Sequence, residues 1–130
     1  MTQEENIGVV KRFTEALQHG DMEVAAGELA SQFEVDDTDI PDSDGQDSFY
    51  TWIGRWNEVF ETWRIEDPEW IPVGEDKVLA LFRMYATGKG SGIELARDDA
   101  TITEFRDGKI AKIGYYNDQQ QAREVAGLDA

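Results

Sequence analysis

The sequence predicts an α+β fold in which three N-terminal helices pack on an antiparallel sheet and a short helix ends the chain. Apolar residues recur every three or four positions over residues 2–19 and 48–63, which is the helical period. From residue 64 the spacing changes to strand alternation, and Asp107-Gly108 separates two such runs. Helices that gather on one face of an antiparallel sheet form an α+β domain. A chain of 130 residues suits one core, so we expect a single domain over residues 1–130.

The first two helices are bounded by recognisable capping residues. Thr2 and Glu5 have the spacing of a capping box at the start of residues 2–19. Gly20 suits the position after a helix end, and Asp21 can cap a second helix over residues 22–30. His19 lies between these helices. As the single histidine of the chain, it is more typical of a helix end than of a metal ligand.

An acidic loop is expected over residues 37–47, after a short extended segment at residues 32–37. Asp42, Asp44 and Gly45 resemble the middle of a calcium-binding EF-hand loop. Ile40 and Thr51 stand where the first and last calcium ligands would be needed. A solvated acidic loop is therefore the better interpretation, and we expect no metal site.

The third predicted helix, residues 48–63, carries one aromatic stripe. Its members are Phe49, Trp52, Ile53, Trp56, Phe60 and Trp63. Such a stripe is usually part of the core. Large rigid rings also make good walls for flat organic ligands, so Trp52 and Trp56 are candidates to border a cavity.

The remainder of the chain reads as a sheet. Pro68 and Pro72 in residues 64–73 favour an edge or bulged strand. Residues 77–87 are apolar on both strand faces, so both must be covered, one by the helices and the other by a second copy of the chain. Residues 93–97 form a further strand, and Asp118 can cap a last helix over residues 119–125.

The hairpin centred on Asp107-Gly108 offers a possible pocket wall. By strand alternation one face of the first arm carries Thr101, Thr103 and Phe105, and the second arm carries Ile113, Tyr115 and Asn117. This mixture of apolar and hydrogen-bonding groups suits a pocket, although ordinary sheet faces also show it.

Composition excludes several classes of function. The net charge is −16, with 28 acidic residues against 12 Lys and Arg, so nucleic acid and anionic membranes are unfavourable partners. No run of 18 apolar residues predicts a membrane span, and the acidic start MTQEEN is unlike a signal peptide. The absence of Cys excludes disulfides and thiolate chemistry. We expect a cytoplasmic protein.

Three stretches together resemble the SnoaL-like, nuclear transport factor 2-like superfamily. They are VVKRFTEALQHGDMEVA at residues 9–25, VDD at residues 35–37 and FRDGKIAKIGYYND at residues 105–118. That superfamily includes ketosteroid isomerases, polyketide cyclases and limonene-epoxide hydrolase. The resemblance implies a cone, in which a strongly curved sheet wraps around helices and encloses a deep apolar pocket. It also implies frequent dimerisation through the sheet and no cofactor.

Carried over position by position, the resemblance retains only part of the ketosteroid isomerase site. The position of the general base falls on Asp37, and the positions of the two oxyanion donors fall on Phe13 and Thr101. One missing oxyanion donor costs about 3–4 kcal/mol of transition-state stabilisation, so steroid isomerisation is not expected.

The other two chemistries of the superfamily also lack their residues. Ile113 and Tyr115 stand where cyclases carry a His or Asp. The epoxide hydrolase arrangement needs an Asp–Arg–Asp set, and strand parity does not bring a convincing trio together. The candidates for that set are Arg83, Arg97, Asp99 and Asp118.

Two functions remain open from the sequence. The first is a cofactor-independent isomerase, cyclase or dehydratase that acts on a small, largely apolar carbonyl compound. Asp37 would transfer the proton, because burial in an apolar cone disfavours the charged form of a carboxylate. The second is a non-catalytic module that binds a small hydrophobic molecule or dimerises, with Asp37 as one more acidic loop residue. The expected ligand-binding residues are Phe13, Trp52, Trp56, Thr101, Thr103, Tyr115 and Asn117.

The acidity also predicts salt tolerance. A surface with this excess of carboxylates stays hydrated at high salt, and added salt screens its self-repulsion. The melting temperature should therefore rise when molar potassium chloride is added, as measured by circular dichroism. A melting temperature indifferent to molar salt would contradict a salt-adapted surface.

Overall fold

The computed structural model describes residues 2–37, 40–44 and 47–128, with the side chains of residues 40–44, 47 and 48 excepted. The elements in chain order are α1 (Gln3–Gln18), α2 (Met22–Gly27), β1 (Leu29–Asp37), β2 (Ile40–Asp44), α3 (Asp47–Val59), β3 (Phe60–Val73), β4 (Lys77–Gly88), β5 (Glu94–Arg106), β6 (Lys109–Tyr116) and α4 (Gln119–Val125). The α+β class is confirmed. The prediction of three helices before the sheet is wrong in one respect, because β1 and β2 precede α3.

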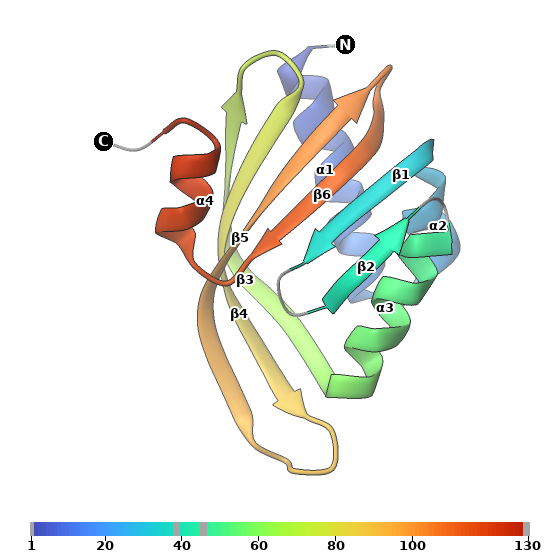
Figure 1. Ribbon diagram of the computed structural model, residues 1–130, viewed down its shortest axis with the longest axis vertical. Coiled ribbons are helices and arrows are strands. Elements are labelled where there is room, and N and C mark those ends of the chain that lie inside the picture. The colour runs from blue at the N-terminus through green and yellow to red at the C-terminus, as the bar shows by residue number, and fades with distance from the viewer. Residues whose placement is uncertain (1, 38–39, 45–46, 129–130) are drawn as a thin grey trace.

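The sheet has six strands in the order β2-β1-β6-β5-β4-β3. It curves around α1 and α3, and α4 lies on the other side (Figure 1). We call the face toward α1 and α3 the inner face and the face that contacts α4 the outer face. β1 pairs with β6 in parallel, with Asp37 opposite Tyr115. The sheet is therefore mixed, and the prediction of an all-antiparallel sheet is wrong. Local hairpin signals do not predict how strands from distant parts of the chain pair.

Helix α1 is fixed at both its start and its buried side. Thr2 and Glu5 form the predicted capping box. Gln3 Nε2 donates to the carbonyl oxygens of Val73, Gly74 and Lys77 at 3.2, 3.0 and 2.8 Å. The first turn of α1 is thereby fastened to the turn between β3 and β4, which sets the position of the helix on the inner face.

Two predicted helix ends are wrong. The second helix stops at Gly27, because β1 begins at Leu29. The third stops at Val59, and the last two members of the aromatic stripe, Phe60 and Trp63, lie in β3. In β3, Trp63 pairs with Ala86 of β4. This pairing overrides the helical spacing of the stripe, since tertiary context commonly outweighs local periodicity.

β3 is an edge strand with a bulge, as its prolines predict. It ends the sheet, and its register with β4 shifts between Glu66 and Glu69. Asp67 has a φ of 52°, in the left-handed region, directly before Pro68. Glu66 and Glu69 are separated by two residues, whereas their partners on β4, Arg83 and Leu81, are separated by one. The extra residue changes which face of the sheet the later side chains of β3 occupy.

The outer face of β4 is covered by the chain's own last helix. Leu79 and Leu81 of β4 and Ala100 and Ile102 of β5 form a small cluster with Ala122 of α4. This explains why β4 is apolar on both faces without a second copy of the chain. Homodimerisation through the sheet stays a prediction.

The second half of the sheet agrees with the expected hairpin. Residues 93–97 and the first hairpin arm belong to one long strand, β5. Asp107 and Gly108 have φ values of 51° and 77°, as the two central positions of a type I′ turn require. Asp118 caps α4 as predicted. Within the described residues, no helix is both long and apolar enough to cross a membrane.

Two glycine-to-alanine substitutions should have opposite effects. Gly108→Ala places a side chain at positive φ and should lower the free energy of unfolding by about 1 kcal/mol. Gly54→Ala, in α3 with nothing within 4 Å of the new Cβ, should raise it by about 0.5–1 kcal/mol. Urea unfolding of both variants measures the pair. Equal stability of Gly108→Ala and the wild type would contradict the type I′ turn.

Candidate functional site

A pocket lies between α1, α3 and the inner face of the sheet. The cavity within it has a volume of about 70 Å³. Its walls are mostly apolar and aromatic, with hydroxyl groups from three threonines and one tyrosine. The bordering residues are Val10, Phe13, Thr14, Leu17, Trp52, Ile53, Trp56, Trp63, Ile65, Trp70, Ala80, Phe82, Thr101, Thr103, Ile113 and Tyr115. All four tryptophans of the chain are among them.

The tryptophans reach the pocket by two routes. Trp52 and Trp56 are four positions apart on α3 and therefore share its buried face. Trp63 and Trp70 are seven positions apart on β3, an odd spacing that would place them on opposite faces of a regular strand. The bulge between Glu66 and Glu69 adds the residue that returns Trp70 to the inner face.

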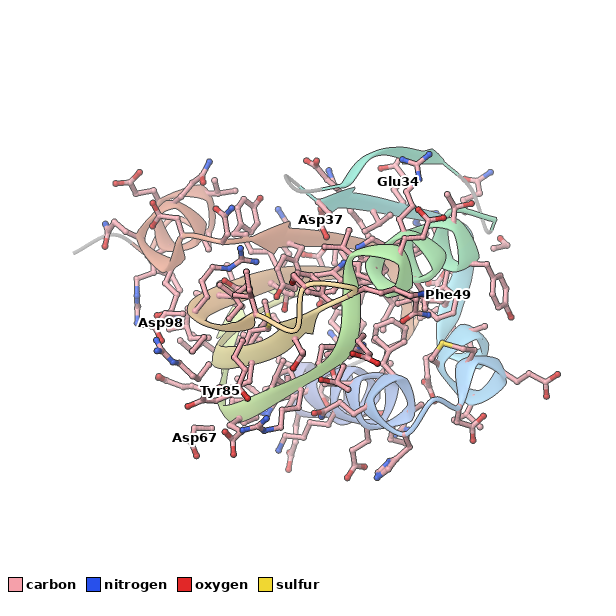
Figure 2. All side chains as sticks on the ribbon, turned by 90° about the horizontal axis from the view of Figure 1, so that it is seen from below. Glu34, Asp37, Phe49, Asp67, Tyr85 and Asp98 are labelled. Carbon is pink, nitrogen blue, oxygen red and sulfur yellow. The ribbon has the colours of Figure 1, made fainter. Side chains whose placement is uncertain are left out.

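Asp37 lies at the end of β1 with its carboxylate directed inward (Figure 2). It is 3% exposed. Trp52 Nε1 and Trp56 Nε1 both donate hydrogen bonds to its Oδ2, at 2.9 and 3.0 Å. An indole N–H can only donate, and an ionised carboxylate oxygen is its best acceptor. Asp37 is not among the described residues that border the cavity, but it contacts the two indoles that do.

A second buried carboxylate, Asp99, lies on the inner face of β5. It is 0% exposed. Arg97 Nε donates to its Oδ1 at 2.6 Å, and Arg97 Nη2 and Tyr115 Oη donate to its Oδ2 at 3.0 and 2.5 Å. Arg97 keeps 26% of its side chain exposed, so the ion pair reaches from the interior toward solvent.

Of the four candidates for an Asp–Arg–Asp set, Arg97 and Asp99 form a pair. The two residues are two positions apart on β5 and share a face. The other candidates are engaged elsewhere. Arg83 pairs with the exposed Asp98 at 2.9 Å, and Asp118 caps α4.

Tyr115 lies between the two carboxylates. It is opposite Asp37 in the β1–β6 register and donates to Asp99. Burial raises the pKa of Tyr115 far above its ordinary value, and the negative charge of Asp99 adds to the shift. Tyr115 is therefore a neutral phenol that borders the pocket and donates its O–H to Asp99.

The structure brings most of the expected ligand-binding residues to one place. Phe13, Trp52, Trp56, Thr101, Thr103 and Tyr115 border the cavity. Asn117 is not among the described bordering residues and lies beyond the end of β6. Whether any of them binds a ligand stays a prediction.

The three residues that resemble a calcium-binding loop lie outside the described backbone or side chains. Gly45 lies outside the described residues, and so do the side chains of Asp42 and Asp44. In the part of the chain that the structure describes, no group of three or more His, Cys, Asp or Glu side chains could hold a metal ion. His19 is the C-cap of α1, as a helix-end residue would be.

Sequence reasoning missed Trp70 and the Arg97–Asp99 pair. Trp70 follows Pro68 by two positions, and its face depends on a bulge whose position the sequence does not give. Arg97 and Asp99 carried a usable signal, because an Arg and an Asp at spacing two on one strand lie on the same face.

Comparison with known proteins identifies the fold and the family. The sequence matches the SnoaL-like domain family over residues 10–113. A candidate polyketide cyclase from Xanthomonas campestris pv. campestris superposes with a TM-score of 0.79 at 20% identity, over 95% of this chain and 97% of the other. A nuclear transport factor 2-like protein of unknown function from Burkholderia pseudomallei gives 0.79 at 17% identity, over 94% and 97%. TerC, crystallised with polyporic acid, gives 0.76 at 17% identity, over 95% and 98%. The search of curated proteins found no significant match.

The pKa of Tyr115 predicts a distinctive alkaline instability. The folded protein holds this proton more tightly than the unfolded chain, so the associated stability is present below pH 10 and is lost as the pH rises above it. Tyr115→Phe should be less stable by about 1–3 kcal/mol at neutral pH, because Asp99 loses a donor. Above pH 10 the variant should lose less further stability than the wild type.

Urea unfolding at neutral pH and at several values above pH 10 measures both effects. Tyr50→Phe, at a side chain that is 54% exposed, is the matched control for loss of a phenol hydroxyl. Parallel alkaline curves for the wild type and Tyr115→Phe would show that Tyr115 does not hold its proton in the folded state.

Proposed function

Since the chain belongs to the SnoaL-like domain family, we propose that its inner pocket binds a small, largely hydrophobic molecule and that Asp37 transfers a proton to or from it. One observation carries this proposal. A buried carboxylate lies directly behind the aromatic wall of an apolar pocket, held there by two indole N–H groups of that same wall. Buried carboxylates in such surroundings are concentrated at functional sites.

Binding requires the pocket to open. Typical small-molecule sites enclose roughly 300 Å³ or more, and this cavity has about 70 Å³. Trp63 and Trp70 are only partly buried and lie on the edge strand β3, where a shift disturbs a single neighbouring strand. Movement of Trp52 or Trp56 would also uncover the Asp37 carboxylate toward the ligand.

The proton-transfer reaction needs no cofactor. In the isomerase form, Asp37 takes a proton from a carbon next to a carbonyl group and returns it to another atom of the same molecule. Thr101 and Thr103 offer hydroxyl donors to the carbonyl oxygen. Tyr115 donates its own O–H to Asp99, so toward a ligand its hydroxyl oxygen is an acceptor. Cyclase and dehydratase reactions would use the same carboxylate with a different bond made or broken.

A second candidate is non-catalytic binding by the same pocket. This function is favoured because both buried carboxylates already accept hydrogen bonds within the protein. Oδ2 of Asp37 already accepts two hydrogen bonds, and Asp99 is engaged by Arg97 and Tyr115. Phe13 and Thr101 also replace the stronger oxyanion donors that the isomerase resemblance would require. A pocket with these groups can hold a ligand without accelerating its chemistry.

The structural neighbours support an organic ligand for this fold. TerC was crystallised with polyporic acid, and several others are candidate polyketide cyclases. These three neighbours are 20% identical or less and show the fold alone, so the proposed ligand class rests on the residues of this chain's own pocket.

The proposal predicts ligand-dependent stabilisation and an essential Asp37. Small hydrophobic ketones or phenols should raise the melting temperature and change the tryptophan fluorescence, because all four tryptophans border the pocket. Asp37→Asn should abolish turnover of any ligand that reacts. It should remain folded, because the amide oxygen can still accept both indole hydrogen bonds.

Glu58→Gln, an equal charge change at an exposed position of α3, is the control. Turnover retained by Asp37→Asn would refute proton transfer through Asp37. Stabilisation without turnover of any compound would favour the non-catalytic function, and no stabilisation by any compound would contradict both.

A further inference from the structure

We infer that Trp70 holds the place of the ligand in this pocket, and that the ligand is a flat, uncharged aromatic molecule with a hydroxyl group. When such a molecule enters, the Trp70 indole moves out toward solvent. The inference rests on the proposed function, because it names the ligand class of the same pocket. Four features support it: the size of the cavity, the contacts of the tryptophans, the bulge in β3 and one row of residues across the sheet.

The cavity is too small for even one aromatic ring. An apolar cavity of about 150 Å³ holds a benzene molecule, whereas this cavity has about 70 Å³. Part of the wall must therefore move before a ring can enter. The bordering residues of α3, β4 and β6 are all buried, but the three from β3, which are Trp63, Ile65 and Trp70, are only partly buried. The wall is thus closest to solvent along β3.

Trp70 is the least restrained of the four tryptophans. Trp52 and Trp56 donate hydrogen bonds to Asp37, and the ring of Trp63 lies 6.1 Å from that of Trp56. Among the residues that the structure describes, Trp70 has neither a hydrogen-bond acceptor for its indole N–H nor a ring partner. The N–H is also not one of the buried polar atoms without a partner, so it contacts solvent. Rotation of Trp70 toward solvent therefore breaks no hydrogen bond.

The bulge in β3 directs Trp70 into the pocket. Asp67 has a φ of 52°, a conformation that is uncommon for residues other than glycine, and Pro68 follows it. Without the extra residue between Glu66 and Glu69, strand alternation would turn Trp70 to the outer face. Bulges are over-represented next to active sites, where they re-aim a side chain. Here the bulge determines that an indole fills the β3 side of the pocket.

Trp70 lies at one end of a row of four bordering residues on the inner face. The cross-strand pairs place them in the order Trp70, Ala80, Thr101 and Tyr115. The two middle side chains are small, so they leave a hollow between the two large rings. Thr101 is partly exposed although Ala80 and Tyr115 on either side of it are buried, so its exposed surface faces this hollow. A flat ring in place of the indole would lie over Ala80 and reach the Thr101 hydroxyl.

The polar groups of this row determine the chemistry of the ligand. Tyr115 donates its O–H to Asp99, so toward a ligand its oxygen accepts, whereas the Thr101 hydroxyl can donate and accept. None of the bordering residues in the described part of the chain is charged. A charged ligand would lose its hydration there without gaining a partner. An uncharged aromatic molecule with one hydroxyl group fits, because that group can donate to Tyr115 and accept from Thr101.

The experiment is a calorimetric titration of the full chain with four compounds at neutral pH. 2-Naphthol has two flat rings and a hydroxyl group, and phenol has one ring. Decahydro-2-naphthol has the carbon skeleton of 2-naphthol but is not flat, and 2-naphthoate is charged. 2-Naphthol should bind most tightly, phenol and decahydro-2-naphthol about tenfold more weakly, and 2-naphthoate not at all.

Trp70→Ala should bind 2-naphthol about tenfold or more tightly than the wild type, because no indole has to leave first. Trp63→Ala is the matched control. It removes an indole of the same strand from the same wall, but one that contacts Trp56, and it should gain no affinity. Thr101→Val keeps the shape of the side chain without its hydroxyl, and it should bind 2-naphthol about fivefold more weakly than the wild type.

A second pair of variants keeps the inference testable if Trp70→Ala does not fold. Trp70→Phe leaves free the part of the space that the larger indole occupies, so its gain in affinity should be smaller but in the same direction. Trp63→Phe should show no gain. Urea unfolding establishes that each variant is folded before it is titrated.

Four results would overturn the inference. Equal binding of 2-naphthol by Trp70→Ala and the wild type would show that the indole is not in the place of the ligand, and the proposed function would survive. An equal gain in Trp63→Ala would show that any enlargement of this wall admits the compound. Binding of 2-naphthoate as tight as that of 2-naphthol would contradict an uncharged ligand. Failure of all four compounds and of every ketone to bind the wild type or Trp70→Ala would overturn the inference and the proposed function together.

Discussion

The arrangement of the interior depends on one carboxylate oxygen. Oδ2 of Asp37 accepts hydrogen bonds from Trp52 and Trp56, which joins the end of β1 to two successive turns of α3. β1 is also the strand that pairs in parallel with β6. The bonds therefore fix α3 against the junction between the two ends of the chain. Because the two indoles also border the cavity, the same contact sets the shape of the pocket.

The sheet register connects this contact to the second buried carboxylate. Tyr115 on β6 lies opposite Asp37 on one side and opposite Thr101 of β5 on the other. Its hydroxyl bonds to Asp99, two residues before Thr101 on the same strand. A slip of one residue in β6 would turn Tyr115 to the outer face and break this link. Strand pairing thus places both acid groups relative to Tyr115.

The sequence predicts what depends on neighbouring residues and fails where distant segments meet. The capping box of Thr2, the edge character of β3 and the turn at Asp107-Gly108 follow from local chemistry, and the structure agrees. The spacing of Trp63 continues the α3 stripe and predicts a helix there, whereas pairing with β4 makes it part of a strand. Trp52 and Trp56 reach Asp37 from α3, and Tyr115 reaches Asp99 from β6, so no local pattern identifies these contacts.

The buried acids near the pocket, Asp37 and Asp99, support the proposed binding function. Replacing a buried ion pair by well-packed apolar residues is often neutral or stabilising, so such pairs are weak evidence of a need for stability. This chain keeps Asp37, Asp99 and Arg97 next to residues that border a mostly apolar pocket, because Asp37 bonds to Trp52 and Trp56 and Asp99 bonds to Tyr115. The hydroxyl of Tyr115 donates a hydrogen bond to Asp99, although a phenylalanine would fill nearly the same space. An interior built only for packing would not require these groups together, whereas a site that orients a polar group within an apolar ligand would.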